Sequence, residues 1–596
     1  MVPAPPPSAA LGLYVPASGP RVSRSSAVAS LERGKVEPAI LGGKPGGKVL
    51  VDVRLGLPSP RPQQAVYVQL PPPGTHPNTR RYLVGVDARG FDGILTSDST
   101  RIRGLVSMPD ITQTAVALAE GKTPNVRSVA GTRVDLQALD DRMAHIHRDR
   151  GWTMVALVLT YAALVVLAPA PSVVATPAGI TASLALAAVG ATRFWLVLAA
   201  SVALTVALAF AGGARRRFIP GVVALFLIGY LAVLVWSPET NALGVLGARP
   251  DGGGRFYGVG NQVETLLLPP LIAAVVVAGR RWIVPLGALA LVTVGWSKAG
   301  ADGGGLVVFT AVLAVLFVRL RAAPLTWRRT ALAGAAAVAL VFALIGLDAA
   351  LGGSSHVTHA VGSGSAVGDF GHRLHLSWAS ITRAWYSAAL FVGCLAGLVW
   401  IAAKRSRRPG VDAMLVAVLV SLLVNDTPVD EILLGALGCL ALLRFESVDS
   451  RPMRRRGVLI AASLLAASAL TGCGSQGVVS PTPQTVVGTV KQEAPGKAIF
   501  ITQGCGACHT YTPAGPDANG QIGPDLDKLA TYAKQAKQPL ATFVHDSIVD
   551  PNKYVGKQCP PSGTAPCPKN VMPKSYKSLP AKDLKDLVDF LTKPQG

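Results

Sequence analysis

The 596-residue chain is poor in charge, in aromatic side chains and, over a long central stretch, in histidine. Only 15% of its residues are charged and 6% are aromatic, whereas 50% are hydrophobic. Residues 151–350 contain no histidine, which excludes the paired histidines that a ladder of b-type haems within helices needs. Basic residues outnumber acidic ones by 56 to 33. They do not alternate with aromatic residues as on a nucleic-acid-binding surface, so we expect no nucleic-acid partner.

Arginine is absent after Arg456, although lysine remains frequent there. Residues 474–596 hold 13 lysines against 9 acidic residues, a net charge of +4. This change of composition indicates that two proteins are joined in one chain, either by a true fusion or by an artefact of the reading frame.

Eleven apolar runs follow residue 151, and each approaches the ~20 residues that span a bilayer. We predict a membrane domain over 151–450 with spans near 152–169, 173–191, 194–213, 218–236, 264–278, 282–296, 305–318, 330–350, 386–403, 411–424 and 431–444.

Charge predicts the direction of these spans. Basic clusters occupy every second connection, which the positive-inside rule places in the cytoplasm: Arg215 to Arg217, Arg280 and Arg281, Arg319 to Arg329, Lys404 to Arg408, and Arg451 to Arg456. The other connections are acidic and are expected to face outward, with Glu239, Asp251, Asp302, Asp369, Asp426, Asp430 and Glu431. One group conflicts with this pattern, because Arg142, Arg148 and Arg150 precede the first span on the side predicted to be outside.

Residues 1–150 are Pro/Gly-rich and contain short β-like runs, which predict a small mixed α/β soluble module. The charge pattern puts this module outside, so we expect a signal or a further span before it. Two segments, Leu95–Arg101 and Asp110–Thr114, resemble the closing segments of alkaline-phosphatase-like domains. The histidines His76, His145 and His147 form no visible metal cluster with carboxylates, so we expect no phosphatase chemistry and interpret both segments as surface loops.

Residues 453–473 have the basic start, apolar run and small-residue end of a secretory signal. Leu470-Thr471-Gly472-Cys473 resembles the lipobox of bacterial lipoproteins, which implies cleavage before Cys473 and its attachment to membrane lipid. A polar linker, 474–494, would follow. The alternative is an ordinary transmembrane helix, and both interpretations place the rest of the chain outside.

The segment Cys505-Gly506-Ala507-Cys508-His509 is the pattern of a c-type haem attachment site. We expect Cys505 and Cys508 to form thioethers with one haem c and His509 to bind its iron. Half of a zinc site and a redox dithiol are the alternatives. Zinc needs a second Cys/His pair and a dithiol needs a βαβ setting, and neither context appears.

Met572 is the one methionine after residue 453. A methionine thioether opposite histidine raises the potential of haem iron, so we assign Met572 as the sixth ligand. His545 is the alternative ligand, but the surrounding pattern predicts that Phe543 and Val544 are buried and that His545 faces water.

Residues 495–596 resemble the class I monohaem cytochromes c. Phe500 precedes the CxxCH motif as in the first helix of that family, and Ile522–Leu526 is similar to its Gly-Pro-x-Leu loop. The resemblance implies an all-α fold in which the Pro524 carbonyl accepts a hydrogen bond from the far ring nitrogen of His509. After Pro580, a last helix is expected to cross the helix of Phe500 and to bury Leu584, Leu587, Val588 and Leu591.

Two further cysteines and two histidine pairs allow more than one interpretation. Cys559 and Cys567 lie in a Pro/Gly/Ser-rich loop, where an exported protein most simply forms a disulfide, two free thiols being the alternative. Two HxxH pairs, His356/His359 and His372/His375, share one loop, for which a solvated loop is preferred to a metal site.

The sequence therefore predicts a mainly α protein: a small α/β module, a polytopic helix bundle and an all-α cytochrome c domain. The expected function is electron transfer rather than enzymatic catalysis, on the outer face of a bacterial cell membrane. The family resemblance implies a quinol-oxidising complex and a terminal oxidase as redox partners. The alternative is a polytopic transporter or glycolipid-processing enzyme with an appended cytochrome, for which Gly254–Gln262 and Asp302–Gly305 are candidate motifs.

Overall fold

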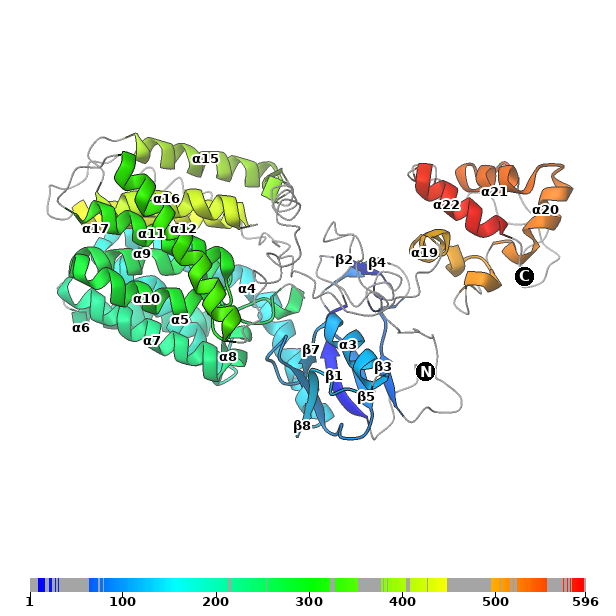
Figure 1. Ribbon diagram of the computed structural model, residues 1–596, viewed down its shortest axis with the longest axis horizontal. Helices are drawn as coiled ribbons and strands as arrows, with labels where there is room; N and C mark the ends of the chain where they lie inside the picture. Colours follow the sequence, from blue (N-terminus) through cyan, green and yellow to red (C-terminus); the bar gives the residue numbers. More distant parts are fainter. Residues whose placement is uncertain are drawn as a thin grey trace.

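The computed structural model describes most residues of 9–447 and of 495–593, and the longest gaps are 32–63, 352–376, 448–494 and 555–571. The described part is mainly helical, with a small mixed sheet near the amino terminus and several apolar helices (Figure 1). This agrees with the predicted mainly α chain that begins with a small α/β module.

The sheet has the strand order β3-β5-β1-β6-β8, and β7 also pairs with β1. Its strands are β1 (Ala10–Tyr14), β3 (Ala65–Val68), β5 (Tyr82–Asp87), β6 (Ile94–Ser97), β7 (Leu105–Val106) and β8 (Val126–Val129), and β2 (Arg21–Ser23) pairs separately with β4 (Thr75–Pro77). Every residue of β1 is buried, because β1 lies between antiparallel β5 and parallel β6.

The two faces of the sheet pack on different helices. Leu11 and Leu13 of β1 belong to a cluster with the first half of α4 (Arg133–Leu167), whereas Ala10 and Tyr14 belong to a cluster with α3 (Met108–Ala119). This division follows from the alternation of side chains along a strand.

The interpretation of Leu95–Arg101 and Asp110–Thr114 as surface loops is wrong. Ser97, Thr100 and Asp110 are all at most 1% exposed. The Asp110 carboxylate accepts hydrogen bonds from the hydroxyls of Ser97 (2.8 Å) and Ser107 (2.7 Å) and from the Ser107 backbone N–H (2.9 Å). These polar groups are buried because they satisfy one another at the start of α3.

Each of the eleven predicted apolar runs lies in a helix. The helices are α4, α5 (Pro169–Ala188), α6 (Phe194–Gly212), α7 (Ile219–Trp236), α9 (Asn261–Ala278), α10 (Ile283–Gly295), α11 (Gly303–Arg319), α12 (Trp327–Ala350), α15 (Trp385–Ala402), α16 (Pro409–Val424) and α17 (Pro428–Ser447). Within the described residues, five helical segments are long and apolar enough to cross a membrane: 133–167, 216–236, 261–278, 331–350 and 385–402. The full count of eleven spans stays a prediction.

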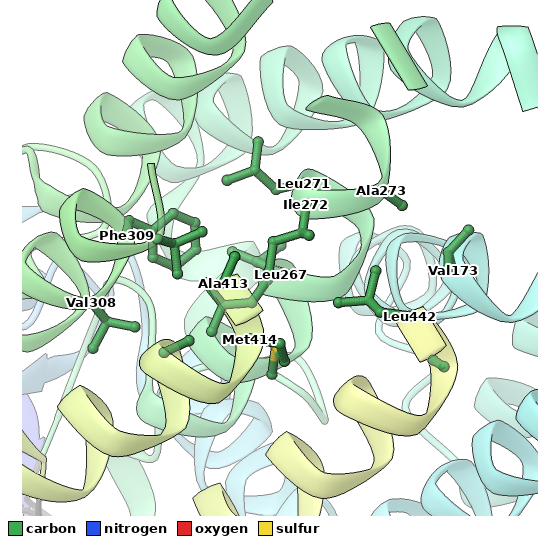
Figure 2. Close-up of a cluster of buried hydrophobic side chains, with 14 of the residues drawn as sticks. Val173, Leu267, Leu271, Ile272, Ala273, Val308, Phe309, Ala413, Met414 and Leu442 are labelled. Atoms are coloured by element: carbon green, nitrogen blue, oxygen red, sulfur yellow. The ribbon is translucent and has the colours of Figure 1, made fainter. Parts of the chain in front are cut away.

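The bundle core is built around α9, whose side chains pack against α11, α16 and α17 (Figure 2). Leu267 and Ile272 of α9 and Met414 of α16 belong to this one cluster. A Cβ on Gly438 of α17 would lie 2.9 Å from both Met414 and Pro269, so this glycine allows three helices to approach closely.

At each end of the bundle, side chains make contacts between connections of like charge: basic connections meet at one end and acidic connections at the other. At the basic end, Arg319 lies 2.7 Å from Asp412 and Arg216 donates to the Phe445 carbonyl (2.7 Å). At the acidic end, Gln262 donates to Asp430 (2.7 Å), and Arg103 of the amino-terminal module lies 3.6 Å from Glu239. The module therefore packs on the connections that the charge pattern assigns to the outside.

Two of the three arginines that conflict with the charge pattern, Arg142 and Arg150, have structural partners at the acidic end. Arg142 donates to the Ala187 carbonyl (2.5 Å), and buried Arg150 donates to the carbonyls of Gly247 (3.0 Å) and Ala248 (3.3 Å). These two guanidinium groups bind backbone carbonyls, which explains their position without a change in the number of spans.

The carboxy-terminal helical unit, 495–593, contains α19 (Pro495–Thr502), α20 (Leu529–Gln535), α21 (Leu540–Val549) and α22 (Ala581–Thr592). Helix α19 packs against α22, which is the helix it is predicted to cross, and the rings of Phe500 and Phe590 lie 6.0 Å apart. A Cβ on Gly496 would collide with the Asp586 carbonyl, so the two helices touch at a glycine. Leu587, Val588 and Leu591 are buried as predicted, whereas Leu584 is only half-buried. Phe590, which the prediction omits, is buried with them.

Candidate functional site

The two cysteines and the histidine of the CxxCH motif lie in one tight turn after α19. Residues Cys505–Ala507 form a single turn of 3₁₀ helix, and the backbone N–H groups of Cys508 and His509 both donate to the Cys505 carbonyl, at 3.2 and 3.0 Å. Both thiols are free. The sequence therefore folds locally so that two thiols and one imidazole are available together.

A second segment of the chain, residues 523–526, lies against this turn and holds the His509 imidazole in place. The Gly523 N–H donates to the Cys508 carbonyl (2.7 Å), and the Leu526 N–H donates to the Thr510 carbonyl (2.8 Å). Between these two bonds, Nδ1 of His509 lies 2.8 Å from the Pro524 carbonyl oxygen. A carbonyl can only accept, so Nδ1 carries the proton and Nε2 keeps its lone pair.

The His509 ring is held in a neutral form. Burial lowers the pKa of His509, and the hydrogen bond to the Pro524 carbonyl opposes this only in part. A neutral imidazole with a fixed tautomer is the form that binds a metal.

Gly523 packs closely against the His509 ring. A Cβ at this position would collide with the ring and lie 2.6 Å from Nδ1 and 2.9 Å from Nε2 of His509. The glycine is needed for close approach of the backbone to the ring.

Tyr576 is a site residue that the sequence did not reveal. Its hydroxyl donates to the Gln503 carbonyl (3.0 Å), two residues before the motif. Burial raises the pKa of Tyr576, and the nearby thiols Cys505 and Cys508 raise it further. Tyr576 thus connects the segment after Met572 to the turn that carries the thiols.

The remaining predicted residues divide into those that the structure describes and those that it does not. Met572 is half-buried, four residues before Tyr576, and its role as a ligand stays a prediction. His545 is half exposed and lies 3.2 Å from Asp546, while Phe543 and Val544 are buried, as predicted. The residues outside the described part are Cys473, Cys559, Cys567, His356, His359, His372 and His375.

The turn fits a covalently attached haem better than a metal ion alone. Nowhere in the described ranges do three or more His, Cys, Asp or Glu side chains gather as metal ligands. The turn instead offers two free thiols beside one metal-binding ring nitrogen. Burial raises the pKa of the Cys505 thiol to about 12, so this thiol is protonated and does not favour direct metal binding.

No protein-family model, curated protein or solved structure matches the chain.

The two glycine-rich motifs of the membrane half also meet in space. The Val259 N–H donates to the Gly300 carbonyl (2.8 Å), and Arg255 lies 3.6 Å from Asp302. Gly258 has a positive φ of 84°, and a Cβ there would collide with the Gly300 carbonyl. The glycines permit this contact between two loops.

Proposed function

We propose that the carboxy-terminal helical unit carries one covalently bound haem c and transfers electrons at the outer face of a bacterial membrane. The hydrogen bond from His509 to the Pro524 carbonyl is the main support. It leaves the lone pair of Nε2 on a neutral imidazole available, in the same turn as two free thiols, as a haem ligand requires.

The residues have distinct roles in this proposal. Cys505 and Cys508 hold the haem by two thioethers, His509 presents Nε2 to the iron and Pro524 fixes the orientation of that ring. Met572 is the proposed sixth ligand. When bound, the haem supplies the Fe(III)/Fe(II) couple.

An apolar core adjoins the turn, and Cys505 packs against it. The rings of Phe500, Tyr511 and Phe590 form a cluster with centroid distances of 5.4 to 6.0 Å, and the Tyr511 hydroxyl donates to the Phe590 carbonyl (3.1 Å). Such burial raises the cost of charge near the iron and so tunes its potential. The net charge of +4 over 474–596 favours docking on acidic surfaces of redox partners, which we propose to be a quinol-oxidising complex and a terminal oxidase.

The decisive experiment tests covalent attachment. The full chain, expressed with haem-attachment machinery, should give a pyridine haemochrome spectrum typical of two thioethers. The double variant Cys505→Ser/Cys508→Ser should lose it, whereas Cys394→Ser, which changes a buried cysteine of α15, should keep it. An unchanged spectrum in the double variant would rule out haem attachment at this turn.

The proposed location rests on two features of the sequence and one of the fold. The charge pattern and the signal at 453–473 both favour an outer position for the carboxy-terminal helical unit, and bundle contacts join loops of like charge. Processing at Cys473 should yield a haem-staining fragment of ~15 kDa. A haem-staining band at the full length alone would favour a transmembrane helix.

The polytopic transporter or glycolipid-processing enzyme remains the second candidate, because the two glycine-rich motifs converge at the acidic end of the bundle. Deletion of residues 474–596 distinguishes the two. A cellular phenotype that survives this deletion supports the second candidate, and one that is lost supports the electron carrier.

A further inference from the structure

Three carboxyl side chains are buried together at the acidic end of the bundle. Glu264 belongs to the first turn of α9, Asp302 caps the start of α11 and Glu431 belongs to the first turn of α17. They are 0%, 2% and 1% exposed, respectively. We call these three residues the acidic centre. Ionisable side chains inside a membrane bundle are costly, and they mark functional sites more often than structural ones.

Glu431 has the partners expected of a buried carboxylate. Its Oε2 accepts a hydrogen bond from the Ser421 hydroxyl (2.9 Å), and its Oε1 accepts one from the Thr427 hydroxyl (2.7 Å). Both oxygens therefore accept a hydrogen bond, which favours the charged form of Glu431.

Glu264 lacks such partners. Its Oε2 accepts a hydrogen bond from the Asn425 amide (2.9 Å), but its Oε1 has no hydrogen-bond donor among the described residues. Asp302 is similar, because its Oδ1 accepts from the Gly305 N–H (3.1 Å) while Oδ2 has no hydrogen bond within the described part. Arg255 lies 3.6 Å from that Oδ2.

The glycines of the second motif bring these groups together. A Cβ on Gly305 would lie 3.2 Å from Cγ of Asp302 and 3.2 Å from Cγ of Glu264, so both acids flank one glycine. A Cβ on the preceding Gly304 would collide with the amide oxygen of Asn425. The Asp302–Gly305 segment thus serves to bring α11 against the Glu264 side chain.

The charges around Glu264 do not balance. The charged groups that act on it are Asp302 from α11, Glu431 from α17 and Arg255 from the preceding loop. One guanidinium group faces three carboxyl groups, and Arg255 is adjacent to Asp302. An unpaired buried carboxylate costs several kcal/mol or more, and protonation removes this cost.

We propose that Glu264 is a proton-binding site of the membrane half, which takes up and releases a proton at the acidic end of the bundle. Asn425 positions its carboxyl group, Glu431 stays ionised, and the pair of Asp302 and Arg255 lies beside it. This site is independent of the haem unit and would couple proton movement to whatever process the bundle carries out.

Dicyclohexylcarbodiimide provides a test, because it reacts with protonated carboxyl groups in apolar surroundings. The purified full chain is treated over a series of pH values, and the adducts are located by peptide mass spectrometry. We expect an adduct on Glu264 at neutral pH that declines about tenfold per pH unit above its titration midpoint. Glu431 is the matched internal control, since it is equally buried but carries two hydroxyl donors, and it should stay unlabelled.

Three results would overturn the proposal: no adduct on Glu264 at any pH, equal labelling of Glu431, or loss of labelling when sodium chloride replaces choline chloride. The last result would indicate a metal cation instead of a proton. Infrared spectra provide a second measurement that does not depend on access of the reagent. A carbonyl band of a protonated carboxyl group should titrate in the wild type and be missing in Glu264→Gln, and its persistence in that variant would also refute the assignment.

Discussion

Replacing Gly523 by alanine tests whether the His509 ring lies where the structure places it. The added Cβ would lie 2.6 Å from Nδ1 and 2.9 Å from Nε2, and the ring cannot move aside without stretching its 2.8 Å bond to the Pro524 carbonyl. Overpacking of this kind costs about 1–3 kcal/mol. Loss of the hydrogen bond would destabilise the fold by about 1 kcal/mol more. In the other direction, alanine makes the unfolded chain less flexible, which raises the free energy of unfolding by about 0.4–1 kcal/mol.

The net expectation for Gly523→Ala is a loss of about 1–3 kcal/mol in the free energy of unfolding of the carboxy-terminal helical unit. Denaturant titration of the full chain, followed by haem absorbance, reports on this unit alone. Thr531→Ala, at an exposed position of α20, is the control and should leave the midpoint nearly unchanged. If Gly523→Ala is as stable as the wild type and keeps the same iron spectrum, the placement of the ring against Gly523 is wrong.

Two other predictions concern the sixth ligand and acid stability. Met572→Ala should abolish the far-red absorption band of methionine-bound ferric haem and lower the potential, whereas His545→Ala should leave both unchanged; the opposite pattern would assign His545 as the ligand. Burial raises the pKa of Asp251, but the hydrogen bond with His147 (2.6 Å) and the charges of Arg249 and Arg150 outweigh it and lower this pKa to about 2. A depressed pKa stabilises the fold above the ordinary value of about 4 and ceases to do so as the pH falls through about 2. The melting temperature of the wild type should therefore fall as the pH is lowered from about 4 to about 2. Asp251→Asn should be less stable than the wild type by about 2 kcal/mol at neutral pH, and its melting temperature should depend less on pH in this range.

Local patterns in the sequence were sufficient to locate the helices. A long apolar run in a membrane can satisfy its backbone groups only as a helix, so each predicted run lies in one. The buried face of α22 and the outward direction of His545 follow from periodicity in the same way. The bond between His509 and Pro524, implied by the family resemblance, is also present.

Contacts between distant parts of the chain could not be predicted. Asn425 and Glu264 are 161 positions apart, and no periodicity connects them. The hydroxyl groups around Asp110 resemble those of a solvated loop until their burial is known. Arg150 was ambiguous because a guanidinium group that binds buried carbonyls has the same sequence signature as one that faces the cytoplasm. Tyr576 gave no signal because its partner is a backbone carbonyl.

Helix α4 has a mechanical consequence. Its 35 residues run without interruption from the amino-terminal sheet into the bundle, a length of about 50 Å. The first half packs on the sheet through Leu136 and Met143, and the second half packs in the bundle through Tyr161 and Val165. Because α4 is one continuous helix, a tilt of the sheet would also tilt the half of α4 that packs in the bundle. A partner that binds the amino-terminal module and tilts it would therefore change the packing of the bundle helices around Tyr161 and Val165.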